Sequence, residues 1–335
     1  MTTYIARRIA MLIVVLIGMS LLTFIISHAI PGDPVRLAAG PHAGPEQIES
    51  LRKQLGFDKP LPVQYLMYIS DLLHGDMGTS IETRKPVREE VLTYLPATAE
   101  LSIFALLISV AIGLPLGVVS ATRKNTFIDN GGRIASLLGA STPIFWLGLL
   151  LQLLFYKKLG LLPIGGRIGI ELNPPAHITG FYIIDSILSG DWLALKSSIL
   201  HLILPAFTLG YGSMAVFTRM TRSSILEVLN EDYIKTARAK GLSERVVIYK
   251  HALRNAILPV MTIIGLQFAS LLGGAVLTET VFSWPGIGNY GVHAIMTLNF
   301  PAIMGVTLIT TVIFVIVNLI VDISYAFIDP RIVYK

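Results

Sequence analysis

The sequence contains no cysteine and few charged residues. Asp, Glu, Lys and Arg make up 14% of its 335 residues, whereas a soluble domain carries about 25%. Without cysteine the chain has no disulfide, no thiolate nucleophile and no Cys-ligated zinc or iron–sulfur site. The low charge, with an apolar content of 53% and a mean hydropathy of +0.69, excludes a cytosolic enzyme or a secreted domain and indicates lipid as the solvent.

The sequence also lacks the usual motifs of nucleotide, metal and hydrolase sites. The dipeptide Gly-Lys does not occur, so there is no P-loop for ATP. The seven histidines form no H-E-x-x-H motif and no pair three or four residues apart, which argues against a metal site, and no Ser, His and acid grouping is recognisable. Gly286-x-Gly288-x-x-Gly291 spells a dinucleotide fingerprint, but it follows a membrane span instead of a strand. We expect it to form a tight turn against the outer membrane face.

Long uncharged runs predict the membrane topology. About 20 apolar residues cross a ~30 Å hydrocarbon core as a helix, and five runs of 22 to 24 residues meet that length. A sixth run, Thr280–Val321, contains the helix-breaking stretch Ser283–Gly291 and therefore splits into a loop and one helix. We predict an all-α membrane protein with six transmembrane helices, at about residues 9–30, 99–121, 134–156, 198–218, 256–278 and 302–326.

The basic residues predict the orientation, because short loops rich in Lys and Arg stay in the cytoplasm. Fifteen of the 26 lysines and arginines fall at the two ends and in segments 122–133 and 219–255. Both termini are therefore expected to be cytoplasmic, and the net charge of +5 requires no nucleic-acid partner. The N-terminal Arg-Arg and apolar run also suit a signal peptide, but the run is too long for one, which favours a retained helix.

The predicted organisation has an N-terminal transmembrane helix (1–30), an extracytoplasmic helical cap (31–98), a core of five spans (99–326) and a cytoplasmic tail (327–335). The cap contains two amphipathic stretches, Gln47–Leu55 and Val63–Leu73. Two more segments, 157–197 and 279–301, lie outside the membrane. The first contains a possible interfacial helix, Ile178–Leu188, and the second is an aromatic, Gly-rich loop.

Small residues in the spans predict close helix packing. Gly113 and Gly117 are four residues apart, as are Gly265, Ala269 and Gly273, so each set lies on one helix face.

Ionisable groups near the membrane are few, and they bear on the possibility of a proton-coupled carrier. Such a carrier needs acids or histidines near mid-bilayer, and we find only His28, His201 and two acids near span ends, Glu279 and Asp322. We expect Asp322 to pair with Arg331 or solvent at the inner surface rather than to relay protons.

The segment 219–255 predicts a structured cytoplasmic knob. Tyr233, Ile234 and Ala237 follow helical spacing, and Gly241 can close that helix as the residue after its C-cap. Ser243 and Glu244 can begin a second helix, Val246–Leu253, that leads into a span. Such a knob fits a groove on a partner and can transmit force.

These residues resemble a known family. Tyr233-Ile-Lys-Thr-Ala-Arg-Ala-Lys-Gly-Leu-Ser, followed by His251-Ala-Leu-Arg-Asn-Ala, is similar to the EAA loop of the dipeptide/oligopeptide/nickel permeases of ABC importers. Ile30-Pro-Gly-Asp-Pro, Pro143-Ile-Phe-Trp, Met220-Thr-Arg-Ser-Ser, the 277–288 stretch and Asp329-Pro-Arg extend the resemblance over the whole chain. The chain departs from the broad pattern, E-A-A-x3-G-x9-I-x-L-P, because Lys235 and Thr236 replace its Glu and first Ala and Leu258-Pro259 comes five residues late.

The resemblance implies a type I ABC importer permease fold in a prokaryotic inner or plasma membrane. It implies a non-catalytic subunit without a cofactor, whose second to sixth spans form half of a path for di- or oligopeptides. The other half would come from a second homologous permease, with two cytoplasmic ABC ATPases supplying ATP hydrolysis and an extracytoplasmic peptide-binding protein delivering the ligand. The residues expected to couple to the ATPase lie in the 230–245 segment: Glu231, Tyr233, Ala237, Arg238, Lys240, Gly241, Leu242 and Glu244.

Three alternatives remain open from the sequence. A nickel or glutathione permease of the same family differs only in its ligand, although the 157–197 loop is more similar to that of dipeptide permeases. A stand-alone proton-driven carrier would need no ATPase. An intramembrane enzyme would need paired catalytic side chains at one depth, which the sequence does not display.

Overall fold

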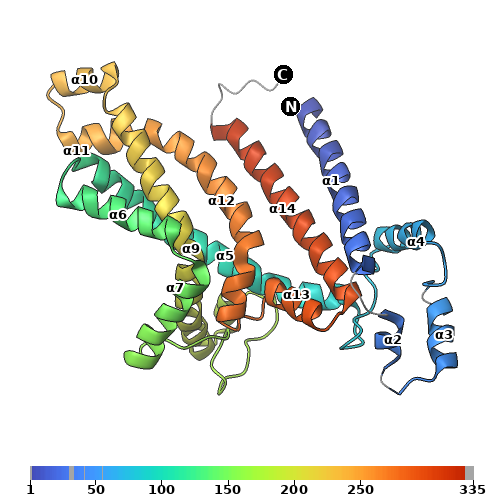
Figure 1. The fold of residues 1–335 in the computed structure, drawn as a ribbon. Helices are drawn as coiled ribbons and strands as arrows, with labels where there is room; N and C mark the ends of the chain where they lie inside the picture. Colours follow the sequence, from blue (N-terminus) through green and yellow to red (C-terminus); the bar gives the residue numbers. More distant parts are fainter. Residues whose placement is uncertain (1, 30–33, 41, 55, 329–335) are drawn as a thin grey trace. The chain divides into compact units, whose positions relative to one another are not determined.

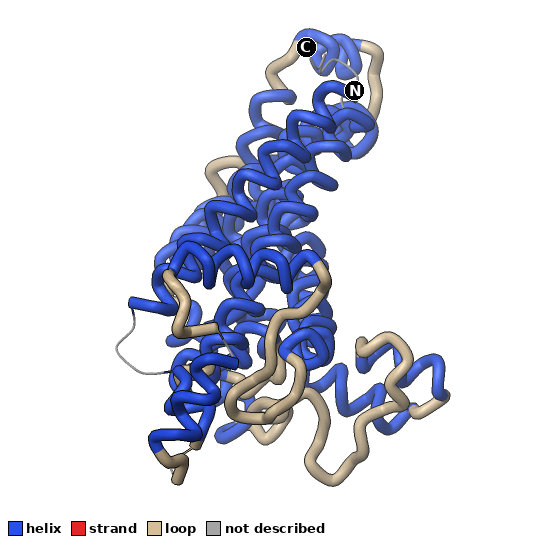
Figure 2. Tube along the Cα trace, turned by 90° about the vertical axis from the view of Figure 1, so that its right-hand side faces the viewer, coloured by secondary structure: helices blue, strands red, loops and turns tan. Residues whose placement is uncertain are grey.

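The computed structural model describes residues 2–29, 34–40, 42–54 and 56–328. These residues form helices joined by loops, and their only extended pairing is an isolated bridge between Thr79 and Pro86 (Figure 2). The elements in chain order are α1 (Thr2–Ala29), α2 (Pro34–Ala39), α3 (Pro45–Gln54), α4 (Leu61–Leu73), α5 (Val87–Thr122), α6 (Phe127–Ser141), α7 (Ile144–Leu151), the π-helical η1 (Gln152–Lys158), α8 (Tyr182–Ser189), α9 (Trp192–Val228), α10 (Asp232–Ala239), α11 (Glu244–Val246), the π-helical η2 (Val247–Ala252), α12 (Leu253–Val281), α13 (Ile287–Met296) and α14 (Phe300–Ile328).

The chain folds into two compact units. Unit 1 comprises Met1–Pro96 and Pro285–Val315, and unit 2 comprises Ala97–Trp284 and Ile316–Lys335. In unit 1, the start of α5 packs on α13 and α14 through Val87, Val91, Ile287 and Ala302. Helices α3 and α4 confirm the two amphipathic stretches predicted in the 31–98 segment.

Unit 2 is a helical bundle whose core lies between α5, α9 and α12 (Figure 1). Leu101 and Ala105 of α5 pack there against Leu202, Ala206 and Leu209 of α9 and Leu271 and Ala275 of α12. The bundle is tight because glycine lets backbones approach. A Cβ on Gly113 would lie 2.9 Å from both Met214 O and Phe217 Cβ, and one on Gly117 would lie 2.8 Å from Thr218 O. The predicted packing role is confirmed for these glycines and for Gly265, which meets Val321, but Gly273 faces open space.

Five helices in the described part of the chain are long and apolar enough to cross a membrane, and the candidate spans are Ala10–His28, Val87–Thr122, Trp192–Val228, Glu244–Gly273 and Phe300–Val321. The predicted single helix over 134–156 is wrong. That segment consists of α6 and of α7 continued by η1, and the two parts are bent by 109° at residues 142–143. Thr142 is extended (φ −81°, ψ 125°) because the residue before a proline avoids helical geometry, and Pro143 is then the N-cap of α7. The described residues contain a sixth membrane span only if α6 and the helix formed by α7 and η1 together make one span.

One other expectation needs correction. The Gly-rich stretch at 286–291 is not a tight turn, since Gly286 is the N-cap of α13 and Gly288 and Gly291 are buried within that helix. Helix α9 continues unbroken past residue 218, where the fourth predicted span ends, as far as Val228. As a result, the helical part of the 219–255 segment begins directly on a membrane helix.

Candidate functional site

Helix α10 and the corner after it form the knob predicted from the sequence. Gly241 has a φ of +77°, its N–H donates to Arg238 O (2.9 Å), and Leu242 N–H donates to Ala237 O (3.4 Å). This pair of bonds is a Schellman motif, which ends a helix at a glycine in left-handed geometry. Asp232 in the first turn complements the positive end of the helix. The predicted short helix and glycine corner are therefore confirmed.

One face of α10 anchors it to the bundle. Ile234 is completely buried and Ala237 is 6% exposed, and both pack against Val247 and Ala252 of η2. Val228 and Leu229, where α9 ends, complete this cluster, called here the α10 base. The α10 base joins α10 to α9 on one side and, through η2, to α12 on the other. Helix α10 is therefore attached by apolar packing to two helices of the bundle.

The opposite face of α10 is open. Of the eight residues expected to couple to an ATPase, only Ala237 is buried, so its side chain positions the helix. The other seven are exposed on α10 and its corner: Glu231, Tyr233, Arg238, Lys240, Gly241, Leu242 and Glu244. Figure 1 shows α10 and α11 at one end of unit 2, with α7 and the loop before α8 at the other.

Two contacts hold this exposed face in shape. Arg238 and Glu244 form an ion pair across the glycine corner, with Nε 2.7 Å from Oε1. Asn255 of α12 donates a hydrogen bond to the hydroxyl oxygen of Tyr233 (2.7 Å). Ile234 and Asn255 were not among the expected site residues. Helical spacing marks Ile234 as the buried position beside Ala237, whereas Asn255 carries no local pattern that would reveal its partner.

A buried ion pair fixes the helices below α10. Asp129, fully buried at the start of α6, accepts two hydrogen bonds from Arg222 of α9, at 2.6 Å from Nε and 2.8 Å from Nη2. Its carboxylate also accepts the backbone N–H of Asn125 (3.0 Å). Bidentate pairing of this kind sets both distance and direction. Asp129 and Arg222 are 93 residues apart, and no local sequence pattern predicts that they pair.

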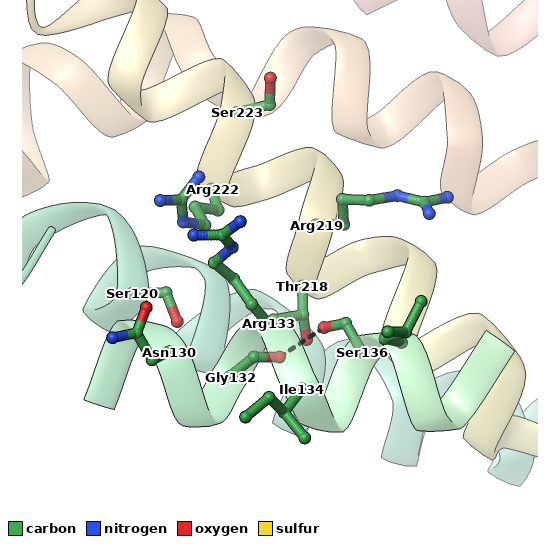
Figure 3. A pocket seen from close by; sticks show the side chains of 11 residues that line it. Ser120, Asn130, Gly132, Arg133, Ile134, Ser136, Thr218, Arg219, Arg222 and Ser223 are labelled. Carbon is green, nitrogen blue, oxygen red and sulfur yellow. Dashed lines mark hydrogen bonds between the residues drawn. The ribbon is translucent and has the colours of Figure 1, made fainter. Parts of the chain in front are cut away.

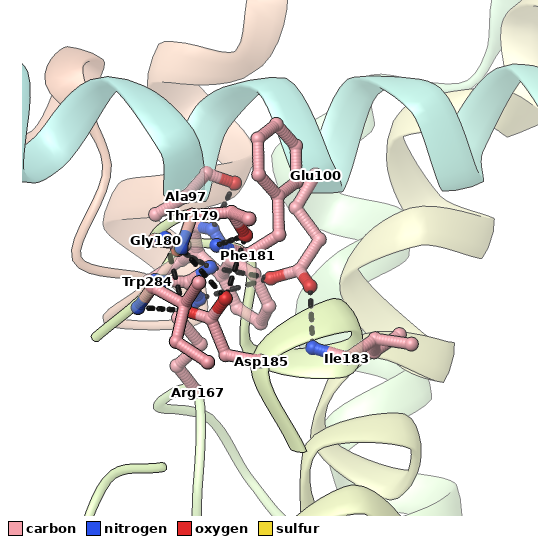
Figure 4. Close-up of polar contacts among 10 residues, drawn as sticks. Ala97, Glu100, Arg167, Thr179, Gly180, Phe181, Ile183, Asp185 and Trp284 are labelled. Carbon is pink, nitrogen blue, oxygen red and sulfur yellow. Dashed lines mark hydrogen bonds and ion pairs between the residues drawn. The ribbon is translucent and has the colours of Figure 1, made fainter. Parts of the chain in front are cut away.

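A second buried ion pair holds the outer loop of unit 2 to α5 (Figure 4). Arg167, 6% exposed, donates to Glu100 from Nη2 (2.6 Å) and Nε (3.0 Å) and to the carbonyl of Gly180 (2.7 Å). Its guanidinium lies 3.8 Å from the ring centroid of Tyr182, a cation–π contact. The other oxygen of Glu100 accepts the backbone N–H of Ile183 (2.9 Å). One carboxylate therefore holds both Arg167 of the loop and Ile183 at the start of α8.

Asp185 shapes the turn before α8. Its carboxylate accepts the backbone N–H groups of Ile178, Thr179 and Gly180 and the Thr179 hydroxyl, at 2.7 to 3.3 Å. Burial raises the pKa of Asp185, but these hydrogen bonds outweigh it and hold the pKa below its usual value. The bonds keep residues 178–181 out of the helix, so α8 begins at Tyr182 and not at Ile178 as the sequence suggested.

The remaining ionisable groups singled out from the sequence have ordinary partners. His28 bonds Phe24 O (2.8 Å) and Gln64, and His201 bonds Ser197 O (2.8 Å). Glu279, fully buried, accepts the Thr98 hydroxyl. The side chain of Asp322 lies outside the described residues. Within the described ranges no group of three or more His, Asp or Glu side chains could hold a metal ion.

Comparison with known proteins gives two family matches. The family described as "Binding-protein-dependent transport system inner membrane component" matches residues 113–334, and its N-terminal counterpart matches residues 1–102. The probable D,D-dipeptide transport system permease protein of Escherichia coli is 50% identical over 321 residues, covering 96% of this chain and 94% of the relative. The dipeptide transport system permease protein of Alkalihalophilus pseudofirmus is 49% identical and covers 100% of both chains. An oligopeptide transport system permease protein of Bacillus subtilis is 43% identical, again over 100% of both.

Two solved structures share the fold. One is the MetNI methionine ABC transporter in inward-facing conformations, at 17% identity and a TM-score of 0.50, covering 70% of this chain and 93% of the other. The second is an amino acid ABC transporter with histidines, at 14% identity and a TM-score of 0.51, covering 71% and 94%. At this identity the likeness establishes the type I importer permease fold alone.

Proposed function

Because the chain belongs to the family of binding-protein-dependent transport system inner membrane components, we propose that it is the peptide-transporting permease subunit of an ABC importer. It is a multi-pass protein of the plasma membrane. The observation that carries the proposal is that α10, anchored by Ile234 and Ala237, and the residues flanking it present seven exposed residues to a partner. Di- and oligopeptides are the ligands, in keeping with relatives of 43 to 50% identity whose names specify dipeptide or oligopeptide transport.

The chain itself is non-catalytic in this proposal. A second, homologous permease supplies the other half of the path, two cytoplasmic ATPases bind and hydrolyse ATP, and an extracytoplasmic binding protein delivers the peptide. ATPase closure presses on the exposed face of α10. The α10 base transmits the force to α9 and α12. The Asp129–Arg222 ion pair holds α6 to α9, so that α6 moves with α9. Rigid helices then open the path toward the outside.

Reconstitution tests this proposal. The complex that co-purifies with the chain is placed in proteoliposomes, and uptake of a radiolabelled dipeptide and ATP hydrolysis are measured together. Leu242→Asp, at a side chain 39% exposed beside the glycine corner, is expected to lower dipeptide-stimulated ATP hydrolysis at least tenfold, because a charge replaces the apolar contact. Ile170→Asp, at a fully exposed side chain of the outer loop, is the matched control and is expected to transport normally.

Two results would contradict the proposal. Dipeptide uptake by this chain alone under a pH gradient, without ATP, would identify a stand-alone proton-driven carrier. ATP-driven uptake of nickel without uptake of dipeptides would leave the permease role intact and overturn the peptide assignment.

A further inference from the structure

A basic pocket opens between α5, α6 and α9 in unit 2 (Figure 3). Its volume is about 770 Å³, and three arginines line it: Arg133 from α6, and Arg219 and Arg222 from α9. Polar groups among the lining residues include Asn130, Ser136 and Ser223. Of its lining residues, the proposed transport mechanism uses Arg222 alone, through its pairing with Asp129.

The charges of the pocket are not balanced. Arg222 is committed to the buried Asp129, which takes up its charge through two hydrogen bonds. Arg133 and Arg219 are exposed, and neither forms an ion pair or side-chain hydrogen bond within the described parts of the chain. In Figure 3 Arg133 extends from α6 in the direction of Arg222, and Arg219 extends along another side of the pocket. Asp129 also attracts Arg133 electrostatically, without an ion pair between the two in the described residues. The pocket therefore presents two exposed guanidinium groups, from two helices, that take part in no ion pair, and serine hydroxyls are among its lining groups.

Apolar side chains continue the pocket along α6. Ile134 and Leu137 line it and are 60% and 68% exposed. Leu137 lies one turn after Arg133, so the same face of α6 carries a cation and then an aliphatic surface. A small soluble anion would leave these aliphatic side chains without a contact. A ligand with an anionic head and a hydrocarbon tail contacts both the arginines and the aliphatic side chains.

We infer that this pocket binds the phosphate group of an anionic phospholipid, with Arg133 and Arg219 as donors and Ile134 and Leu137 against an acyl chain. Guanidinium groups match phosphate oxygens in charge and planar geometry. Basic pockets between membrane helices on the cytoplasmic side are suited to anionic headgroups, and the positive-inside rule places these three arginines on that side. Arg222 acts indirectly, since its pairing with Asp129 fixes the separation of α6 and α9 across the pocket.

Native mass spectrometry of the purified full chain tests the inference. The chain is exchanged into detergent with phosphatidylglycerol or phosphatidylcholine of equal chain length, and retained lipid is counted. The wild-type chain is expected to retain phosphatidylglycerol about tenfold more than phosphatidylcholine. R133Q/R219Q is expected to lose this preference, whereas R133K/R219K keeps the charges and most of the preference. R123Q/K124Q removes the same charge from two exposed residues of the loop that precedes α6, outside the pocket, and is expected to behave as wild type.

Four results would overturn the inference. Equal loss of preference in R123Q/K124Q would show a general surface-charge effect without a site. No loss in R133Q/R219Q would remove the pocket arginines from lipid binding. Displacement of the lipid by millimolar inorganic phosphate would indicate a site for a small anion. Displacement by a dipeptide with a free carboxylate, and not by its C-terminal amide, would assign the pocket to the transported peptide.

Discussion

Asp129 is fully buried at the start of α6 and forms an ion pair with Arg222, which is 21% exposed, while Arg133 adds electrostatic attraction without an ion pair among the described residues. Removing one member of a buried pair leaves the other charge without its partner, which costs more than removing both. We expect Asp129→Asn to lower the free energy of unfolding in detergent by about 3 kcal/mol. The double variant Asp129→Asn/Arg222→Gln should be more stable than Asp129→Asn alone, because it leaves no unpaired charge. A single variant as stable as the wild type would show that the pair does not hold α6 to α9.

Asp185 gives a pH-dependent prediction. Its pKa is lowered below the usual 3.8, so the carboxylate stabilises the folded state above that value, and this contribution is lost as pH falls through the folded-state pKa. The outer loop should therefore resist proteolysis equally at pH 5 and pH 7 and become sensitive only below pH 3.8. Asp185→Asn should make residues 178–181 sensitive at pH 7. Glu171→Gln, an exposed acid of the same loop, is the control, and equal resistance of the two variants would contradict the role of Asp185.

At the scale of elements, α10 depends on its base more than on its own eight residues, because so short a helix is unstable alone. Ile234→Ala removes most of a fully buried side chain and should destabilise the docked helix by about 2 to 4 kcal/mol. The backbone amides of residues 232–239 should therefore exchange hydrogen faster in this variant than in the wild type. Thr236→Ala, on the exposed face of the same helix, should leave exchange nearly unchanged. Slow exchange in Ile234→Ala would mean that the α10 base does not anchor the helix.

The elements also show what the sequence could and could not predict. The end of α10 was predictable because Gly241 and the spacing of Ile234 and Ala237 act locally. The break before α7 was also local, at Pro143, but an uninterrupted apolar run concealed it. The helix over Ile287–Met296 was missed because its glycines suggest turns, whereas here they permit burial, as where Gly291 approaches Val306. The Glu100–Arg167 and Asp129–Arg222 pairs were not predictable, since each joins residues at least 67 positions apart.

At the scale of the whole molecule, the orientation in the membrane is a prediction. It can be tested by cysteine labelling, because the sequence contains no cysteine. Because the chain has none, single cysteines introduced at Lys240 and Ile170, both exposed, can be labelled without background. A membrane-impermeant maleimide added to intact cells should label Ile170→Cys only, and Lys240→Cys should react after the membrane is opened. The reverse pattern would place α10 outside the cell and remove any role in contacting a cytoplasmic ATPase.

The central claim is that α10 is the element on which a partner ATPase acts. A photo-crosslinking group attached at Leu242 in the assembled complex tests it most directly, with the same group at Ile170 as control. We predict that the Leu242 probe crosslinks to an ATPase subunit and that the yield changes when ATP is trapped, whereas the Ile170 probe does not reach that subunit. Absence of an ATPase crosslink from Leu242, in a complex shown to contain the ATPase and to hydrolyse ATP, would contradict the account.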